Sequence, residues 1–354
     1  MTANPKISAL ILAAGKGTRM KSTKAKVLHE VFFAPMLHHV LDAVQPLTPI
    51  QTIIVIGHQG EQVKAAVKDY PVVFAEQQQQ LGTGHAVLAA EEHLRKVENG
   101  TVMILCGDTP LIRTETLGRM VAEHFAQNNP LSVMTTVLAD PANYGRIITD
   151  ESGNVLRIVE EKDASPAERK IREVNAGIYC VDTGLLLGAL WKVDSGNKQG
   201  EFYLTDIVGI ANREGHAVSR FLCPEPDEVL GVNSRLELAQ AHAGLQQRRN
   251  RELMAAGVTI LQPESTFVEK QVVIGCDTVL HPGVHLQGAT VVGSGCSVGP
   301  YAMLQGAVVG DGARVGGFSW LVGTQVAVGE SVPAGTRNIA ACEAGGNSNG
   351  IAGG

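Results

Sequence analysis

A six-residue repeat in the last quarter of the chain constrains its fold more than any other feature. Aliphatic residues recur at every sixth position over 268–304, resume after a one-residue slip at Val309 and Val315, and continue after a second slip at Val322 and Val328. A unit this short buries its aliphatic side chain only by stacking on its neighbours. The spacing therefore predicts a triangular parallel β-helix of about four coils, with one hexapeptide on each face.

Residue usage changes near position 260, where we place a domain boundary. Residues 1–261 contain 21 glycines and residues 262–354 contain the other 19, and the last lysine is Lys270. We predict a first domain over 1–232, a linker helix over 233–257 capped by Asn233, a β-helix over 258–343 and a disordered tail over 344–354.

The first part of the chain alternates apolar runs with stretches of helical pattern. The strand-like runs are 7–12, 52–56, 72–75, 102–105 and 132–138, and the helical stretches are 36–44, 61–67, 86–96 and 116–125. Such alternation is typical of an α/β fold with a mostly parallel sheet covered on both faces. In these sheets ligands bind at the carboxyl ends of the strands.

Composition excludes several classes of protein. A hydrophobic content of 44% and a charged content of 18% indicate a soluble globular chain. A net charge of −6 gives no support to nucleic acid as the main partner, and no apolar run is long enough to span or insert stably into a membrane. The N-terminus lacks the apolar region of a signal peptide, and the six cysteines are scattered, so we expect reduced thiols in the cytoplasm.

A loop of small residues follows the first apolar run. The string G-K-G-T-R-M at 15–20 matches neither the P-loop nor the dinucleotide fingerprint, and Lys16, Arg19 and Lys26 add positive charge. Backbone N–H groups of such a loop can point at phosphate oxygens while the cations neutralise them. An ordinary turn with solvated charges is the alternative, but the full string followed by A-K-V-L favours phosphate binding.

Two further segments have both a functional and a structural interpretation. Asp108 follows a predicted strand, where its carboxylate could bind Mg²⁺ or cap the next helix. Four glutamines over 77–80 precede Gly82 and Thr83, and their amides could contact a base edge. On composition alone, this second segment is better explained as a polar linker before a helix.

A strand-rich region over 131–222 holds candidate sugar contacts. The strings Y-G-R at 144–146, E-E-K at 160–162 and N-A-G at 175–177 could each bind hydroxyl groups, or could each form a hairpin or surface pair. His281 and His285 in the repeat have no carboxylate or cysteine cluster nearby, which favours ordinary surface positions.

These strings occur together in one order. They are L-A-A-G-K-G-T-R-M, A-K-V-L-H, Q-L-G-T-G-H-A, C-G-D-T-P-L-I, N-Y-G-R-I, V-E-E-K-D-A, V-N-A-G-I-Y, G-E-F-Y-L-T-D and G-V-N-S-R-L-E-L. Over residues 6–305 the chain closely resembles the bacterial bifunctional N-acetylglucosamine-1-phosphate uridylyltransferase / glucosamine-1-phosphate acetyltransferase family. The resemblance implies a Rossmann-like nucleotidyltransferase domain followed by a short left-handed β-helix.

The resemblance also implies a reaction: UTP and N-acetylglucosamine 1-phosphate give UDP-N-acetylglucosamine and pyrophosphate, with Mg²⁺ as cofactor. Catalysis of such a transfer consists mostly of positioning and charge neutralisation. Matched motif by motif, the nucleotide would contact Leu12, Ala13, Ala14 and Gly15, with uracil bound by Gln77, Gly82 and Thr83. Arg19 and Lys26 would face the triphosphate and act in catalysis, and Asp108 and Asn233 would hold Mg²⁺. The sugar would lie against Gly145, Glu160 and Asn175, with Tyr203 and Thr205 nearby.

The chain departs from the family pattern in several places. Ala25 stands where the family usually has Pro, Cys106 where it often has Tyr, and Ala176 where it has Thr, which removes a hydroxyl beside the sugar. The repeat region contains no H-L-T-Y-L-G-D-like string and no lysine after Lys270. We therefore expect no acetyltransferase activity, and expect the β-helix to form a homotrimer.

Three other functions remain open from the sequence. The enzyme could transfer a nucleotide to another hexose 1-phosphate, such as glucose 1-phosphate or mannose 1-phosphate. The hexapeptide helix could serve a CoA-dependent acyltransferase, although the catalytic strings are missing. The chain could also be a non-catalytic sugar-nucleotide sensor, which would not need a complete set of metal and triphosphate residues.

Overall fold

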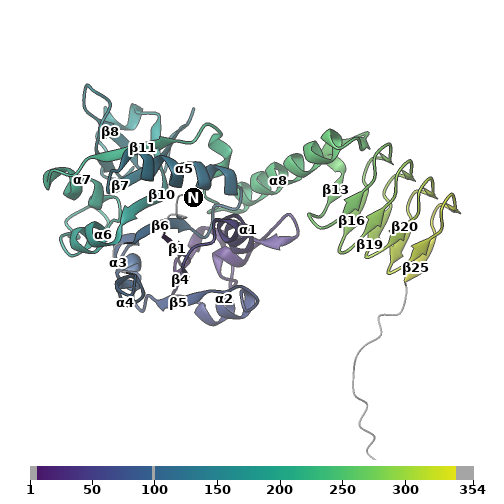
Figure 1. The fold of residues 1–354 in the computed structure, drawn as a ribbon, viewed down its shortest axis with the longest axis horizontal. Helices are drawn as coiled ribbons and strands as arrows, with labels where there is room; N and C mark the ends of the chain where they lie inside the picture. The colour runs from purple at the N-terminus through teal and green to yellow at the C-terminus, as the bar shows by residue number, and fades with distance from the viewer. Residues whose placement is uncertain (1–5, 98–99, 340–354) are drawn as a thin grey trace, which may run out of the picture. The chain divides into compact units, whose positions relative to one another are not determined.

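The computed structural model describes residues 6–97 and 100–339. The chain divides into two compact units, Met1–Ala241 and His242–Gly354, and the division lies within helix α8 (Arg235–Ala255) (Figure 1).

The first unit is built on a nine-stranded sheet with the main order β11-β7-β10-β6-β1-β4-β5. All pairs along this path are parallel except those of β10, so the predicted mostly parallel sheet is confirmed. A hairpin of β8 and β9 attaches to β10. The strands are β1 (Ile7–Leu12), β4 (Thr52–Ile56), β5 (Val73–Glu76), β6 (Thr101–Cys106), β7 (Leu131–Val137), β8 (Arg146–Thr149), β9 (Val155–Val159), β10 (Glu173–Asp182) and β11 (Val218–Leu222). A small separate hairpin pairs β2 (Glu30–Val31) with β3 (Ala34–Pro35).

Helices cover both faces of this sheet (Figure 1). In β1, Ile7, Ala9 and Ile11 belong to one buried cluster and Leu10 to the other. Strands buried on both faces are apolar throughout, which is why they appear in the sequence as continuous apolar runs. The first cluster includes residues of α1 (Met36–Val44), α2 (Gly60–Ala66) and α5 (Thr114–Gln127). The second includes residues of α3 (Thr83–Leu88), α4 (Glu91–Arg95), α6 (Thr183–Leu190) and α7 (Asp206–Arg213).

The single helix predicted over 86–96 is wrong, because the segment forms two helices, α3 and α4. At Ala90 the backbone leaves the helical region, with φ −92° and ψ 2°. Val87, Ala90 and Leu94 are nevertheless all buried in the same cluster. The apolar spacing therefore continues across the break, so the break cannot be predicted from the periodicity of apolar residues.

The predicted start and cap of the long helix are also wrong. The helix begins at Arg235, and the Ser234 hydroxyl accepts the hydrogen bond of the Glu237 N–H (3.3 Å). The Glu237 carboxylate in turn accepts the backbone N–H of Asn233 (2.6 Å), in the manner of a capping box. Because Ser234 provides the cap, the Asn233 side chain is available to another part of the fold.

The second unit contains a parallel β-helix. Its strands form three parallel sheets with four complete turns and two strands of a fifth, in agreement with the predicted architecture. The strands are β12 (Thr259–Ile260), β13 (Phe267–Val268), β14 (Val273–Ile274), β15 (Val279–Leu280), β16 (His285–Gln287), β17 (Val291–Val292), β18 (Ser297–Val298), β19 (Met303–Gln305), β20 (Val308–Val309), β21 (Arg314–Val315), β22 (Trp320–Val322), β23 (Gln325–Val326), β24 (Ser331–Val332) and β25 (Arg337–Ile339).

The repeat register predicted at Val322 and Val328 is wrong. The buried residue of β22 is Leu321, six positions after that of β21, and the next is Val326, whereas Val328 is 77% exposed. The shortened step between β22 and β23 lies at the same corner as the first slip, between β19 and β20. A residue lost at a corner leaves the three faces aligned, so the stacking of aliphatic side chains continues.

Side chains of α8 bind the start of the β-helix within this unit. Gln246 and Asn250 are buried, and their amides donate to the carbonyl oxygen of Thr266 at 3.0 and 2.9 Å. Phe267 lies against His285, with ring centroids 5.6 Å apart. Burial lowers the pKa of His285, so this half-buried histidine has a packing role that the sequence did not reveal.

Some sequence predictions concern segments beyond the described residues. The tail over 344–354 and Cys342 lie outside them. The five cysteines within the described part of the chain are free thiols. Across residues 6–97 and 100–339, no helix is both long and apolar enough to cross a membrane.

Candidate active site

One edge of the sheet gathers the predicted nucleotide residues. Because β1, β4, β5 and β6 are parallel, their carboxyl ends lie at the same edge. Leu12 ends β1, Gln77 follows β5 and Asp108 follows β6. The antiparallel β10 brings its amino-terminal half to this edge, where the Gly177 carbonyl lies 3.7 Å from the Cys106 sulfur.

The loop after β1 is shaped by glycine at two positions. A Cβ at Gly15 would meet no atom within 4 Å, so the backbone there is open to an approaching ligand. Gly17 has φ +58°, and a Cβ there would lie 2.6 Å from the Lys26 Cβ. Gly17 therefore provides the left-handed turn and leaves room for the Lys26 side chain. Ala13 and Ala14, at the start of this loop, are buried.

Three predicted residues, distant in sequence, meet around one positive charge. Lys26, on the short helix η2 (Lys26–Leu28), forms an ion pair with Asp108. Its ammonium also donates to the side-chain oxygen of Asn233, 207 residues away, at 3.0 Å. The Asp108 carbonyl accepts the backbone N–H of Val232 (2.9 Å), which holds the segment before α8 beside the end of β6.

The oxygen atoms of Asp108 and Asn233 fit a divalent cation such as Mg²⁺. Both contact the same ammonium, so a carboxylate and an amide oxygen converge on one cationic position. Mg²⁺ is commonly bound by one or two protein oxygens together with substrate phosphates and water. The described residues contain no group of three or more His, Cys, Asp or Glu that could hold a metal.

Arg19 is placed differently from Lys26. It lies on the short helix η1 (Thr18–Met20) and is exposed. Among the described residues it forms no ion pair or side-chain hydrogen bond with another predicted site residue. Its assignment to the triphosphate stays a prediction.

The segment around Gln77 is ordered by hydrogen bonds within the protein. Gln77 is only 3% exposed and donates to the Gly82 carbonyl at 3.0 Å, unlike a side chain in a solvated linker. Gly82 has φ +117°, and a Cβ there would lie 2.5 Å from the Phe202 carbonyl oxygen. The Thr83 hydroxyl accepts the Leu204 N–H (3.0 Å), so this segment is joined to the one that carries Tyr203 and Thr205.

The predicted sugar residues form a second group. The Thr205 hydroxyl donates to the Glu160 carboxylate (3.0 Å), and burial raises the pKa of Glu160. The Asn175 N–H donates to the Gly145 carbonyl at 2.9 Å. The Tyr203 hydroxyl accepts a hydrogen bond from Gln199 at 2.6 Å.

The Asn175 side chain is engaged within the protein at both ends. Its amide nitrogen donates to the Tyr179 hydroxyl (2.8 Å), and its oxygen accepts the Gly177 N–H (3.0 Å). These bonds span the point where the register between β10 and β7 shifts. Asn175 therefore shapes the strand at the sheet edge, in addition to any contact with a ligand.

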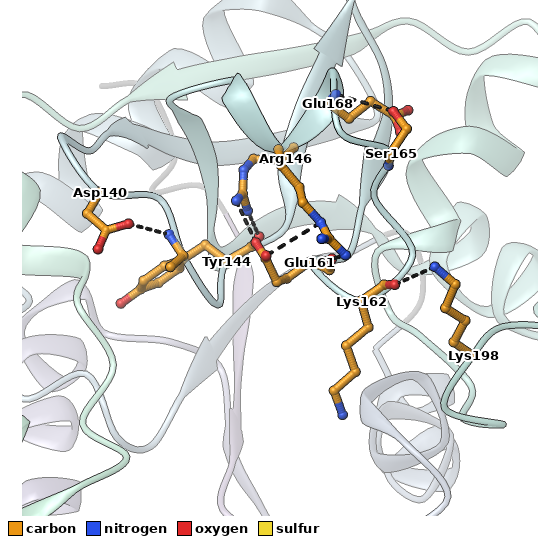
Figure 2. Close-up of polar contacts among 10 residues, drawn as sticks. Asp140, Tyr144, Arg146, Glu161, Lys162, Ser165, Glu168 and Lys198 are labelled. Carbon is orange, nitrogen blue, oxygen red and sulfur yellow. Dashed lines mark hydrogen bonds and ion pairs between the residues drawn. The ribbon is translucent and has the colours of Figure 1, made fainter.

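The sequence predictions missed a buried arginine next to this group that pairs with a partly exposed glutamate. Arg146 is 1% exposed, and its guanidinium contacts the Glu161 carboxylate at 2.5 Å and the Tyr144 carbonyl (Figure 2). The only sequence signal was an arginine placed directly after Gly145 at the start of a strand. Tyr144 is half-buried near this edge, and burial raises its pKa.

Comparison with known proteins agrees with this architecture. A family model for the MobA-like NTP transferase domain matches residues 9–156, and one for the bacterial transferase hexapeptide matches residues 271–306. The hexapeptide match identifies the parallel β-helix as the left-handed kind. A crystal structure of a Bacillus anthracis protein, provisionally assigned as a glucose-1-phosphate thymidylyltransferase, is similar in fold, with a TM-score of 0.53 and 21% identity over 67% of this chain and 94% of that one.

Curated relatives cover most of the chain. The bifunctional protein GlmU of Desulfotalea psychrophila is 49% identical over 94% of this chain and 98% of its own length. Those of Geobacter metallireducens and Heliobacterium modesticaldum are each 47% identical over 85% and 83% of this chain. The chain spans only 63% and 64% of the length of these last two. With its nucleotidyltransferase domain and hexapeptide β-helix, the chain belongs to the GlmU family.

Proposed function

We propose that this nucleotidyltransferase forms UDP-N-acetylglucosamine and pyrophosphate from UTP and N-acetylglucosamine 1-phosphate. The observation that carries the proposal is the meeting of Lys26, Asp108 and Asn233 beside the glycine loop. This arrangement places a cation and two metal-type oxygen donors where the strands of an α/β sheet present their ligands.

The reaction requires two anions to approach each other. A phosphate oxygen of the sugar phosphate attacks the α-phosphorus of UTP, and the bond between that phosphorus and the bridging oxygen breaks to release pyrophosphate. The nucleophile is already ionised, so the protein needs no general base and acts through positioning and charge neutralisation. Lys26 and Arg19 would neutralise phosphate oxygens as negative charge shifts toward the leaving group.

Asp108 and Asn233 would hold Mg²⁺ with the triphosphate. When bound, the metal would add positive charge at the phosphates and orient them. The Lys26 ammonium contacts both residues, so it lies close enough to act on the same phosphates.

Two groups of residues, one around Gln77 and one around Glu160, would select the substrates. Gln77, Gly82 and Thr83 would bind uracil, and the nucleotide would follow residues 12–15 toward the loop. Gly145, Glu160 and Asn175, with Tyr203 and Thr205, would bind the sugar. The hydrogen bond from Leu204 to Thr83 would fix the distance between the two groups.

A second candidate is transfer to another hexose 1-phosphate. Ala176 carries no hydroxyl where the family has Thr, and this position adjoins Asn175 at the sugar group. A test of both candidates is pyrophosphate release over a panel of UTP and other nucleoside triphosphates with N-acetylglucosamine, glucose and mannose 1-phosphates. Fastest turnover with UTP and N-acetylglucosamine 1-phosphate is expected, and preference for glucose or mannose 1-phosphate would support the second candidate instead.

We also propose that the β-helix is an assembly surface for a cytoplasmic homotrimer and that this segment carries no acetyl transfer. Flat-faced β-helices can pack around a three-fold axis, and the sequence has no lysine after Lys270. Light scattering after size-exclusion chromatography should give three times the chain mass. Acetyl-CoA turnover with glucosamine 1-phosphate should be absent, and measurable turnover would refute this part.

A further inference from the structure

We propose that Arg146 is a positioning residue for the sugar phosphate, acting by holding together the three backbone segments that carry Gly145, Glu160 and Asn175. The inference rests on the proposed sugar group. Arg146 is 1% exposed, so its guanidinium reaches no ligand in solution and acts only through the residues it contacts.

The first segment is the loop before β8. Arg146 donates a hydrogen bond to the carbonyl of Tyr144 and so spans Gly145 from the following position. A Cβ at Gly145 would lie 2.9 Å from the Ile158 side chain and 3.6 Å from the Glu160 carboxylate. The Glu160 carboxylate therefore lies near Gly145 with no side chain between them, and the bond from Arg146 to Tyr144 constrains the loop at this point.

The second segment is the turn after β9. The Glu161 carboxylate accepts a hydrogen bond from Arg146 at 2.5 Å, and Glu161 directly follows Glu160 (Figure 2). The Glu160 carbonyl accepts the N–H groups of Asp163 and Ala164, each at 2.9 Å. The Glu161 side chain therefore joins this turn to Arg146, and the backbone hydrogen bonds to the Glu160 carbonyl stabilise the turn itself.

The third segment is the amino-terminal half of β10. Arg146 is the residue of β8 that pairs with β10, opposite Val174. The next residue, Asn175, donates its N–H to the Gly145 carbonyl at 2.9 Å. All three segments consequently meet at one buried guanidinium. Glu161 is partly exposed and also pairs with Arg169 (3.7 Å), so loss of Arg146 leaves the Glu161 charge hydrated and paired but removes the group that joins the segments.

The chain offers a matched control on the same hairpin. Arg157 on β9 forms an ion pair with Glu168 at 2.7 Å, but its side chain is 55% exposed, whereas that of Arg146 is 2% exposed. The exposed pair should contribute little to local order. Arg157→Met removes the same kind of interaction without touching the three segments.

The kinetic test compares Arg146→Met with Arg157→Met. We expect Arg146→Met to raise KM for N-acetylglucosamine 1-phosphate about tenfold, with KM for UTP and kcat within about twofold. Arg157→Met should leave all three constants within about twofold of the wild type. Equal losses for both substrates, or no change in Arg146→Met, would overturn the positioning role. If Arg146→Met does not fold, Glu161→Gln weakens the same pair by removing its negative charge.

A second measurement is independent of the reaction. Hydrogen exchange of the amides over 160–164 and of Asn175 should quicken in Arg146→Met and Glu161→Gln, but amides over 77–84 should exchange as in the wild type. Unchanged exchange in the first set overturns the positioning role. If the wild type turns over none of the sugar phosphates, the proposed function fails, while the exchange data still decide whether Arg146 orders these segments.

Discussion

The two units of this chain obtain their structure from contacts of very different range. In the β-helix, each strand pairs with the strand one coil away. Each buried side chain therefore stacks on a residue that lies about three hexapeptides away in the sequence. In the α/β unit, Lys26 contacts Asn233 across 207 residues. A fold built from short-range repeats can be predicted from the sequence pattern. The geometry of the candidate active site depends instead on contacts between residues far apart in the chain.

The largest expected effect is a difference in turnover between alanine variants of two aspartates, one in each unit. Asp108→Ala should lower Mg²⁺-dependent turnover about 1000-fold, because it removes a carboxylate from the proposed metal site. Asp311 accepts a backbone N–H from Ser294 in the neighbouring coil at 2.8 Å, so Asp311→Ala should leave turnover within about twofold. Pyrophosphate release measures both. Near-normal turnover of Asp108→Ala would remove Asp108 from the metal site.

The next effect tests whether the β-helix responds separately from the α/β unit. Leu304 is 1% exposed, and Leu304→Ala should lower the free energy of unfolding of the β-helix by about 3 kcal/mol. The neighbouring Met303 is 44% exposed, so Met303→Ala should lower this free energy of unfolding by less than about 0.5 kcal/mol. Calorimetry should show a lower transition for the β-helix in Leu304→Ala and an unchanged one for the α/β unit. An equal fall of both transitions would mean that the units unfold together.

A smaller effect compares two glycines with similar backbone angles. Gly17→Ala should reduce turnover about tenfold, because the added Cβ has to displace the Lys26 side chain as well as adopt positive φ. Gly312 in the β-helix has φ +66° with no atom within 4 Å of the Cβ position, so Gly312→Ala should cost about 1 kcal/mol of stability and leave turnover intact. Steady-state kinetics and thermal melts distinguish the outcomes. If Gly17→Ala is fully active, the glycine does not position Lys26.

The smallest effect concerns Glu160. Because burial raises the pKa of Glu160, the folded state holds its proton more tightly than the unfolded state, and its contribution to stability falls as pH rises from about 4.3, the ordinary value, through the raised pKa. Glu160→Gln should therefore lose less stability than the wild type over that interval. Urea titrations at a series of pH values measure this, with the exposed Glu151→Gln as control. Parallel curves for wild type and Glu160→Gln would contradict a raised pKa at this carboxyl.

Errors in the sequence predictions have a common cause. The continuous helix over 86–96 and the cap at Asn233 both followed from local patterns that the structure also satisfies in another way. The second slip of the repeat was misplaced because Val322 and Leu321 are both aliphatic, so only the stacking shows which one is buried. Local patterns identified the elements but not their junctions.

The sequence by itself determined the alternating α/β unit, the hexapeptide β-helix and the family to which the motifs belong. Its periodicities are local, and each follows from which face of a strand or helix must be buried. Only the tertiary structure decided that Lys26, Asp108 and Asn233 meet and that Arg146 lies buried behind the sugar group. These contacts depend on strand order and on the antiparallel direction of β10, which no local pattern encodes.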